Sequence, residues 1–544
     1  MRKCPKCSAR LSPLYFGTVC KHCGADLMYY HFDERLEQDE QKAAAQDEKV
    51  RRLLGKLPFL KKRNNRNTVK SVNIMNFARQ CEPRSESVDK ILFETTEKQL
   101  ALVNELQLPN TFLLQYDTLC DERFVKLFKE KAGPLTEIGL WYEIVEPLTS
   151  ACDMKYESEY GWKWDWHIKP GFSMAYTPDE RDRLIDTRTA CRLADRYGVK
   201  CLCICRDQTN TDAYSLVGGY FNGAYYPSRN NIFTPAQTAE NSLGIPVLRL
   251  LGPDPIRNYD GKKFLTEEEA AGSLMCTLEP VWYAGSDDGY ESALLDDFYG
   301  SESLNFAYAQ IGQENSFGDS DIISPLRRQI EKIMQRGDVA FEKMTETAER
   351  FGKEFNHTTP PSSTAALKNP GGEDVQSVYY QCKNYVADIF RDGGRVFIRA
   401  FYLFDENVPE HYTEDTCDSF YALYENLPVV DTVIWSEGIR EDIGLTLDKS
   451  GAEFSYENLS DTSVKISWND KCVIFTPDGI ETSGITEMTY DPMNAQAEIE
   501  ASAHRIDYKY KGARYALLTN GDVAFENNLI TVKGMDIRLI PERQ

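Results

Sequence analysis

The 544-residue sequence has no uninterrupted apolar run that approaches the roughly 20 residues of a membrane-spanning helix. Its first residues, MRKCPKC, also lack the apolar segment of a secretory signal peptide. These two absences predict a cytoplasmic protein without a transmembrane segment. The 15 cysteines fit a reducing compartment, because several lie in apolar runs such as VKCLCICRD, where a thiol acts as a small buried hydrophobe.

Positive charge is scarce over most of the chain, and the formal net charge is −23. Residues 1–70 contain 16 lysines and arginines and 8 aspartates and glutamates. The rest of the chain contains 46 lysines and arginines and 77 aspartates and glutamates. An acidic body of this kind disfavours nucleic acid as its partner. The length allows two or three domains with cores of their own, which is enough for an enzyme.

Four cysteines near the start of the chain follow the pattern C-x2-C-x12-C-x2-C. Two such pairs can direct four thiolates to one tetrahedral Zn²⁺, in a closed structural site without an open coordination position. The predicted ligands are Cys4, Cys7, Cys20 and Cys23. Residues 1–30 resemble the small zinc ribbons at the N-termini of many bacterial proteins, in which the metal supplies the folding energy. We expect a structural or adaptor-like module, with structural zinc as its cofactor.

Residues 31–70 combine a predicted surface helix, ERLEQDEQKAAAQDEKVRRLLGKL, with a basic segment. Between Lys49 and Lys70 there are nine basic residues and no acidic one. The simpler interpretation is a solvated linker. The alternative is an electrostatic tether to an anionic surface, such as a polymer, a lipid headgroup or nucleic acid, and its binding would depend on salt.

Apolar, strand-like runs alternate with helical stretches over residues 71–318. The runs are SVNIMNF, NTFLLQYD, TEIGLWYE, VKCLCICRD, IPVLRLLG and LNFAYAQIG. This order predicts parallel strands joined by crossover helices, and a (β/α) barrel of six to seven strands is the simplest closure. In such a barrel the functional side chains lie where strands end and loops begin.

Charged residues recur at these expected strand ends. The set comprises Arg79, Glu82, Arg84, Asp117, Glu143, Arg206, Asp207, Arg249, Asp254 and Glu314. Any one of them alone is typical of a solvated loop. Their recurrence at consecutive strand ends favours a shared pocket.

Several motifs within roughly Val72–Phe317 carry a family resemblance. They are NTFLLQYDTLCDERFVKLFKE, EIGLWYE, DWH, RDQ and GQENSFG. They resemble the seven-stranded barrels of the polysaccharide deacetylase and related glycoside hydrolase superfamily, which implies a carbohydrate substrate. Metal-dependent deacetylases of that family carry paired aspartates on the first strand and H-x3-H on the third. Here Trp141 and Val145 stand where imidazoles would be needed, so no catalytic metal ligand is assigned.

Two aromatic-rich segments, GWKWDWHIKPGF and GGYFNGAYYPSRNN, have the composition of a sugar site. Sugars present apolar C–H faces and a rim of hydroxyls, so their sites combine aromatic platforms with a few polar groups. In an extended segment the indoles share one face and Asp165 and His167 the other. The alternative is that the indoles cover a core. The predicted substrate-binding residues are Glu82, Arg84, Asp117, Trp141, Trp164, Trp166, Arg206, Tyr225 and Arg229.

Cleavage of a glycosidic bond needs two carboxyl groups, one protonated and one ionised. The catalytic candidates are Glu143, Asp165, Asp207 and Glu314, with His167 as a further acid candidate. Arg206 beside Asp207 favours the ionised form of that aspartate. The glycan, its linkage and the oligomeric state stay open, as does the choice of acid and nucleophile.

A glycoside hydrolase-like enzyme is the favoured interpretation, and three alternatives stand beside it. No apolar strand lies between Thr177 and Tyr197, where the family places its fourth strand, so the barrel could be degenerate and bind carbohydrate without catalysis. A metal-dependent deacetylase is the second alternative. The third is a zinc-ribbon adaptor whose barrel is a scaffold.

The C-terminal part changes character. Residues 319–372 are predicted to form a charged helical extension, beginning ISPLRRQIEKIMQR, and a loop. Residues 373–544 contain short strands with asparagine- or aspartate-glycine turns between several of them, which predicts an antiparallel β-sandwich. A bracing role is favoured, because no aromatic cluster there exceeds what a core needs.

Overall fold

A computed structural model describes most of the second half of the chain and part of the first. The described ranges are 68–80, 88–142, 202–204, 304–318, 321–355, 360–368, 374–403, 427–432, 444–492, 497–510 and 512–543, with the isolated positions 22–23, 147, 150, 292, 295–297, 299 and 300. The chain divides into two compact units, Met1–Asn64 and Asn65–Gln544. The elements below all belong to the second unit.

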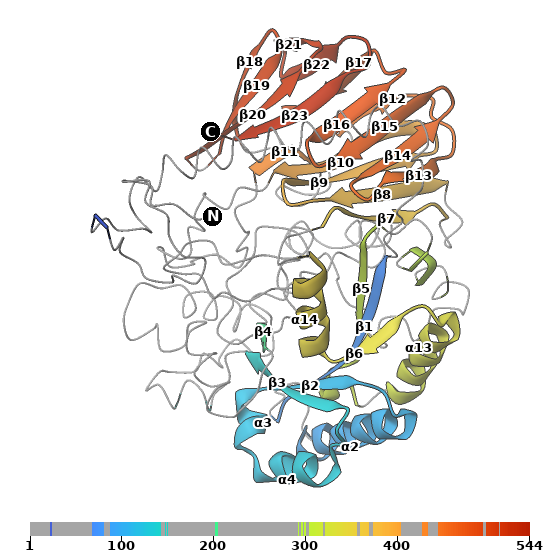
Figure 1. Cartoon of the computed structure of the whole chain (residues 1–544), viewed down its shortest axis with the longest axis vertical. Helices are drawn as coiled ribbons and strands as arrows, with labels where there is room; N and C mark the ends of the chain where they lie inside the picture. The colour runs from blue at the N-terminus through green and yellow to red at the C-terminus, as the bar shows by residue number, and fades with distance from the viewer. Residues whose placement is uncertain are drawn as a thin grey trace. The chain divides into compact units, whose positions relative to one another are not determined.

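A six-stranded parallel sheet occupies the first part of this unit (Figure 1). Its strands are β1 (Val69–Ala78), β2 (Asn110–Leu114), β3 (Thr136–Tyr142), β4 (Leu202–Ile204), β5 (Phe306–Ile311) and β6 (Ala340–Glu342). The order is β4-β3-β2-β1-β5, and β6 also pairs with β1. Every pairing is parallel, so the carboxyl ends of the strands meet at one edge. The predicted parallel strands are therefore confirmed for β1 to β5, whereas the predicted strand IPVLRLLG lies outside the described residues.

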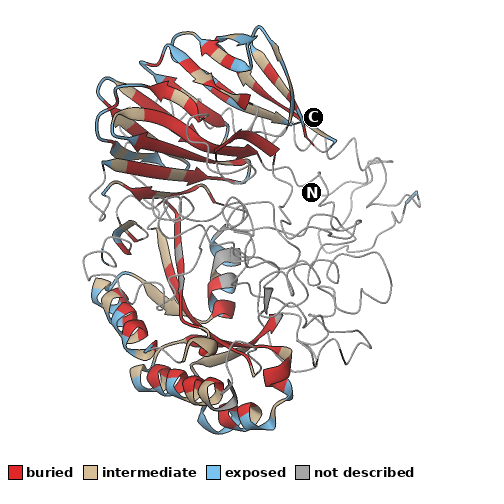
Figure 2. Cartoon of the chain, turned by 180° about the vertical axis from the view of Figure 1, so that it is seen from behind, coloured by how far each residue is buried: buried red, intermediate tan, exposed pale blue. Residues whose placement is uncertain are grey.

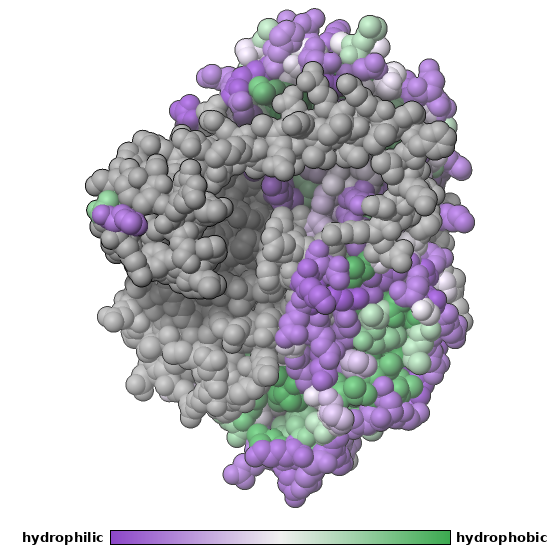
Figure 3. Space-filling view, viewed as in Figure 1, coloured by the Kyte–Doolittle hydropathy of each residue, from purple (hydrophilic) through white to green (hydrophobic). Residues whose placement is uncertain are grey.

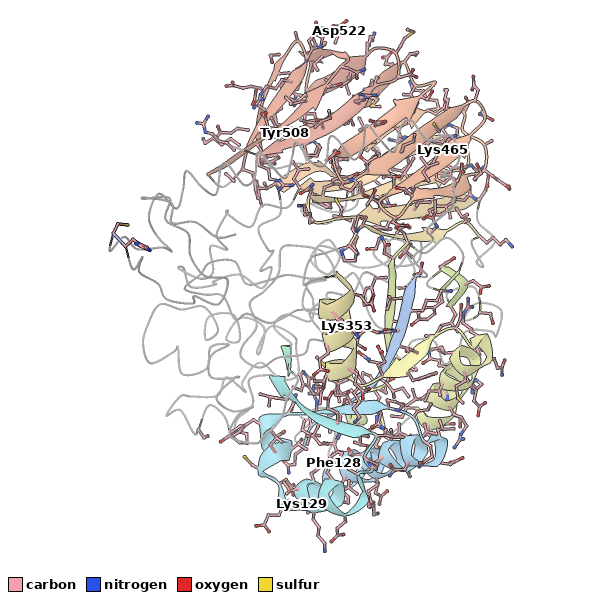
Figure 4. All side chains as sticks on the ribbon, in the orientation of Figure 1. Phe128, Lys129, Lys353, Lys465, Tyr508 and Asp522 are labelled. Carbon is pink, nitrogen blue, oxygen red and sulfur yellow. The ribbon has the colours of Figure 1, made fainter. Side chains whose placement is uncertain are left out.

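Helices cover both faces of this sheet. They are α2 (Val88–Leu106), α3 (Tyr116–Cys120), α4 (Glu122–Lys131), α13 (Ile323–Arg336) and α14 (Met344–Phe355), with a 3₁₀ turn η2 (Asn315–Phe317). Phe128 of α4 packs edge-on against Phe112 of β2, with ring centroids 5.1 Å apart, whereas its neighbour Lys129 points away from the sheet (Figure 4). The visible faces of α4 and α14 are mainly hydrophilic (Figure 3). Within the described ranges, no helix is both long and apolar enough to cross a membrane.

The register of β1 and β2 assigns α4 and α14 to opposite faces. Phe112, which contacts α4, lies beside Asn76, and Leu113 lies beside Phe77. The other face carries Asn73, whose amide donates to the Thr347 hydroxyl of α14 at 2.8 Å. We call this second face the α14 face, and side chains alternate onto it along each strand.

Three layers follow one another along the α14 face of β1. A polar layer lies at the amino end, where Glu342 accepts hydrogen bonds from Ser71 at 2.8 Å and from Arg350 at 2.8 Å. An apolar layer follows, formed by Met75, Phe77, Leu113, Trp141 and Met344. Charged side chains come next, at the carboxyl end. Figure 2 shows β1 as mostly buried, in keeping with its position inside the sheet.

Two antiparallel sheets follow the parallel one. Their strands are β7 (Ser362–Ala366), β8 (Val375–Gln381), β9 (Tyr385–Asp392), β10 (Arg395–Leu403), β11 (Leu427–Asp431), β12 (Leu445–Asp448), β13 (Ser455–Ser460), β14 (Ser463–Trp468), β15 (Lys471–Thr476), β16 (Gly479–Ser483), β17 (Glu487–Tyr490), β18 (Glu498–Ser502), β19 (Arg505–Tyr510), β20 (Ala513–Thr519), β21 (Asp522–Glu526), β22 (Leu529–Lys533) and β23 (Arg538–Arg543). A nine-stranded sheet has the order β21-β22-β17-β12-β10-β9-β8-β7, with β11 on β10. An eight-stranded sheet has the order β13-β14-β15-β16-β23-β20-β19-β18.

One apolar core is shared by these two sheets, and it includes Tyr385, Phe401, Trp468 and Phe475. Alternate residues of each strand point into it, as in β14, where Val464, Ile466 and Trp468 are buried. The predicted antiparallel β-rich region is therefore confirmed. The structure adds that the segment predicted as helical extension and loop also supplies two strands, because β6 pairs with β1 and β7 pairs with β8.

Candidate functional site

Arg79, Trp141 and Glu314 meet at the carboxyl end of the parallel sheet. Arg79 directly follows β1, and Trp141 is the penultimate residue of β3. Glu314 follows β5 and lies opposite Phe77 of β1 in a parallel bridge. The sheet thus joins three segments that are distant in sequence, at the edge where parallel sheets usually carry their functional groups.

The centre of this site is an ion pair between a buried arginine and a largely buried glutamate. Arg79 Nε lies 2.7 Å from Glu314 Oε1, and the two side chains are 4% and 16% exposed. The Ser316 hydroxyl donates a hydrogen bond to the same Oε1. The Arg79 Nε–H lacks hydrogen-bond alignment, so its contact with Glu314 is mainly Coulombic. A guanidinium and a hydroxyl at one carboxylate favour its ionised form.

Trp141 supports the cationic side of the pair. The Arg79 guanidinium carbon lies 4.7 Å from the centre of the indole ring, within the range of a cation–π interaction. Phe77 packs edge-on against the same indole, with centroids 5.2 Å apart. Trp141 is buried, and its Nε1–H meets no acceptor among the residues that the structure describes. Its ring contacts in this part of the chain are with Arg79 and Phe77.

Asn315, at the start of η2, binds the backbone of Arg79 from both sides. Its Oδ1 accepts from the Arg79 N–H at 3.1 Å, and its Nδ2 donates to the Arg79 carbonyl at 2.8 Å. Neither Asn315 nor Ser316 was among the predicted site residues. The available signal was the motif GQENSFG, which contains both beside Glu314.

Asp117 occupies a different position, within α3 just after β2. Its carboxylate accepts from the Thr118 N–H at 2.6 Å and from the Gln80 N–H at 3.2 Å. The Thr118 hydroxyl in turn donates to the Ala78 carbonyl at 3.0 Å. Buried Asp117 thereby ties the loop after β1 to α3, which follows β2, and this is an orienting role.

The structure brings together two of the predicted site residues, Trp141 and Glu314, and places Asp117 in α3, which follows the neighbouring strand β2. The following predicted site residues lie outside the described residues: Glu82, Arg84, Glu143, Trp164, Asp165, Trp166, His167, Arg206, Asp207, Tyr225 and Arg229. Of the predicted zinc ligands, Cys23 lies with His22 in an exposed turn, and Cys4, Cys7 and Cys20 lie outside the described residues. In the described part of the chain, no group of three or more histidine, cysteine, aspartate or glutamate side chains is arranged to hold a metal ion.

Comparisons with known proteins include a distant structural similarity. No protein-family model matches the chain, and no curated protein matches it. The fold is similar to a crystal structure from Parabacteroides distasonis described as a "putative glycoside hydrolase/deacetylase", with 13% sequence identity and a TM-score of 0.41. The similarity covers 63% of this chain and 87% of that chain. A similarity of this size leaves the activity to be argued from the residues themselves.

Proposed function

We propose that this chain is a carbohydrate-active protein whose parallel sheet carries a glycoside hydrolase-like site. The observation that supports this proposal best is the Arg79–Glu314 pair, a carboxylate held by a cation at the carboxyl end of a parallel sheet. The motifs EIGLWYE and GQENSFG, which resemble the deacetylase and glycoside hydrolase superfamily, supply Trp141 and Glu314 respectively.

In this proposal Glu314 is the ionised member of a carboxyl pair. A carboxylate that contacts Arg79 and Ser316 is suited to attack the anomeric carbon or to activate a water molecule. It is poorly suited to donate a proton, because both contacts favour its charged form.

The proton donor is proposed to be Glu143, which directly follows β3 and is two residues from Trp141. A carboxyl group next to a tryptophan and a tyrosine is less hydrated and keeps its proton more readily. Asp165, Asp207 and His167 are the other candidates for this role. No metal enters these steps, since Trp141 and Val145 replace the imidazoles that a deacetylase needs.

The full-length protein should be tested on a panel of glycans for release of reducing ends, with and without a chelator. We expect cleavage of at least one glycan, unchanged by the chelator. If the protein instead releases acetate, and this activity disappears with the chelator and returns with zinc or cobalt, it is a metal-dependent deacetylase and the proposal is wrong. Binding without turnover would indicate a non-catalytic carbohydrate-binding protein, and no binding at all would indicate a scaffold.

The N-terminal cysteines are proposed to hold one structural zinc ion. We expect one zinc per chain by elemental analysis of the reduced full-length protein, because C-x2-C-x12-C-x2-C supplies four thiolates. A chain carrying both Cys4→Ser and Cys7→Ser should lose this zinc, and it also controls for any effect of the chelator on the N-terminal module. Reduced protein without stoichiometric metal would contradict the proposal.

A further inference from the structure

We propose that Asn315 is the positioning residue of the Arg79–Glu314 pair. Its carboxamide is completely buried and makes two hydrogen bonds to Arg79, one with the N–H at 3.1 Å and one with the carbonyl at 2.8 Å. Two bonds from one planar amide fix both the position and the orientation of the backbone that carries the guanidinium. The catalytic meaning of this role rests on the proposed function, whereas the positioning itself does not.

The same carboxamide is anchored to α2. Asn315 Nδ2 also lies 3.2 Å from the Leu92 carbonyl and 3.1 Å from the Thr96 hydroxyl. The Thr96 hydroxyl donates to the Leu92 carbonyl at 2.9 Å, so the acceptor side of the cluster is itself ordered. Asn315 therefore joins the end of β1 to a helix that packs beside it, and its side chain has little freedom to move.

Both members of the ion pair are held by this one residue. Glu314 is attached through the peptide bond, and Arg79 is attached through the two backbone hydrogen bonds. The neighbouring Gln313 carbonyl reinforces the arrangement by accepting from the Phe77 N–H at 3.1 Å and from Gln99 Nε2 at 2.8 Å. Removing the carboxamide leaves the Arg79 N–H and carbonyl without these partners, and the 2.7 Å contact loses the support that sets it.

If Asn315 positions the ion pair, its removal should weaken the energetic coupling between Arg79 and Glu314. If it only stabilises the fold, its removal should leave that coupling unchanged. Hydrogen exchange of peptides covering β1 and β5 should be measured in the full-length protein for Arg79→Met, Glu314→Gln and the double variant. Each variant lowers the amide protection factor by some ratio relative to the wild type. We expect the product of the two single-variant ratios to be about tenfold larger than the ratio for the double variant, and we call this excess the coupling factor. When Asn315→Ala is introduced into the wild-type protein and into each of these three variants, we expect the coupling factor to fall below about threefold.

Asn73→Ala is the matched control, because Asn73 is also completely buried and belongs to β1, the strand that Arg79 follows. Its Nδ2 donates to the Glu342 carbonyl at 2.9 Å and to the Thr347 hydroxyl at 2.8 Å, in the polar layer at the other end of β1. We expect Asn73→Ala to lower protection while preserving the coupling factor. If Asn315→Ala folds too poorly to measure, Asn315→Asp keeps the shape and the acceptor for the Arg79 N–H. It replaces the Nδ2 donor by a carboxyl oxygen and adds a negative charge when ionised, so it should be measured at two pH values.

The proposal is overturned if the coupling factor survives the loss of the Asn315 carboxamide, or if Asn73→Ala reduces it equally. This measurement needs no substrate, so its outcome is independent of whether any glycan is cleaved. If a glycan is cleaved, the Asn315 variant should lower kcat more than it raises KM. The acid limb of its pH profile should also move to higher pH, because a less firmly held Arg79 stabilises ionised Glu314 less.

Discussion

Glu314→Gln is expected to lower turnover about a hundredfold or more on any glycan that the protein cleaves. Glutamine keeps the shape of the side chain but cannot carry the charge that attack or water activation requires. The change also leaves the buried Arg79 guanidinium without its carboxylate, which destabilises a protein by roughly 3 kcal/mol when burial is nearly complete. Rates should therefore be compared at a temperature where circular dichroism shows the variant to be folded.

Glu342→Gln provides the matched control for this loss of an ion pair. Glu342 is 14% exposed and lies 2.8 Å from Arg350, so its own burial resembles that of Glu314, whereas its partner is 29% exposed against 4% for Arg79. It belongs to the polar layer at the amino end of β1, away from Arg79 and Glu314 at the carboxyl end of that strand. We expect this variant to lose stability and to keep its turnover. Equal rates for the two variants would remove Glu314 from the catalytic group.

Gly312→Ala is expected to destabilise the parallel sheet by roughly 4 kcal/mol or more, because backbone strain and a steric clash act together. Gly312 has φ +131°, and a Cβ there would lie 1.8 Å from the Met75 carbonyl oxygen. The end of β5 can approach β1 this closely only without a side chain. Since Glu314 follows two residues later, we also expect a loss of turnover. Hydrogen exchange of β1 and β5 peptides should show the loss of stability.

Gly337→Ala is a control that introduces backbone strain without a steric clash. Gly337 ends α13 with φ +70°, and a Cβ there would meet no atom within 4 Å. We expect this substitution to destabilise the protein by about 1 kcal/mol, from the left-handed backbone alone. A Gly312→Ala variant that is no less stable than Gly337→Ala would contradict the close approach of β5 to β1.

Much of the parallel sheet could be predicted from sequence pattern. NTFLL and TEIGLWY are apolar runs between helical stretches, and they became β2 and β3. The three-residue β6, Ala340–Glu342, could not be found in this way, because AFE is too short to show a period. Its place beside β1 depends on the packing of α14, which no local pattern encodes.

The candidate site was predictable in part, and for a different physical reason. The strand-end rule selected Arg79 and Glu314, since that rule needs only the position of each strand. It could not show that the two side chains pair, because this requires knowing that β5 is the neighbour of β1. It also could not distinguish a ligand-facing Asp117 from one that holds Gln80 and Thr118, because those hydrogen bonds depend on where α3 begins.

The pairing of β1 with β5 also governs how this chain can be synthesised. Arg79 and Asn315 are 236 residues apart, so a ribosome completes β2, β3 and β4 long before β5 and β6, the later neighbours of β1, exist. During that interval one edge of β1 has backbone donors and acceptors without their native partners, which is a template for aggregation. A sheet of such high contact order also folds slowly. The pairing of β1 is complete only after Phe306–Ile311 and Ala340–Glu342 have emerged, which makes β1 the aggregation-sensitive strand of the nascent chain.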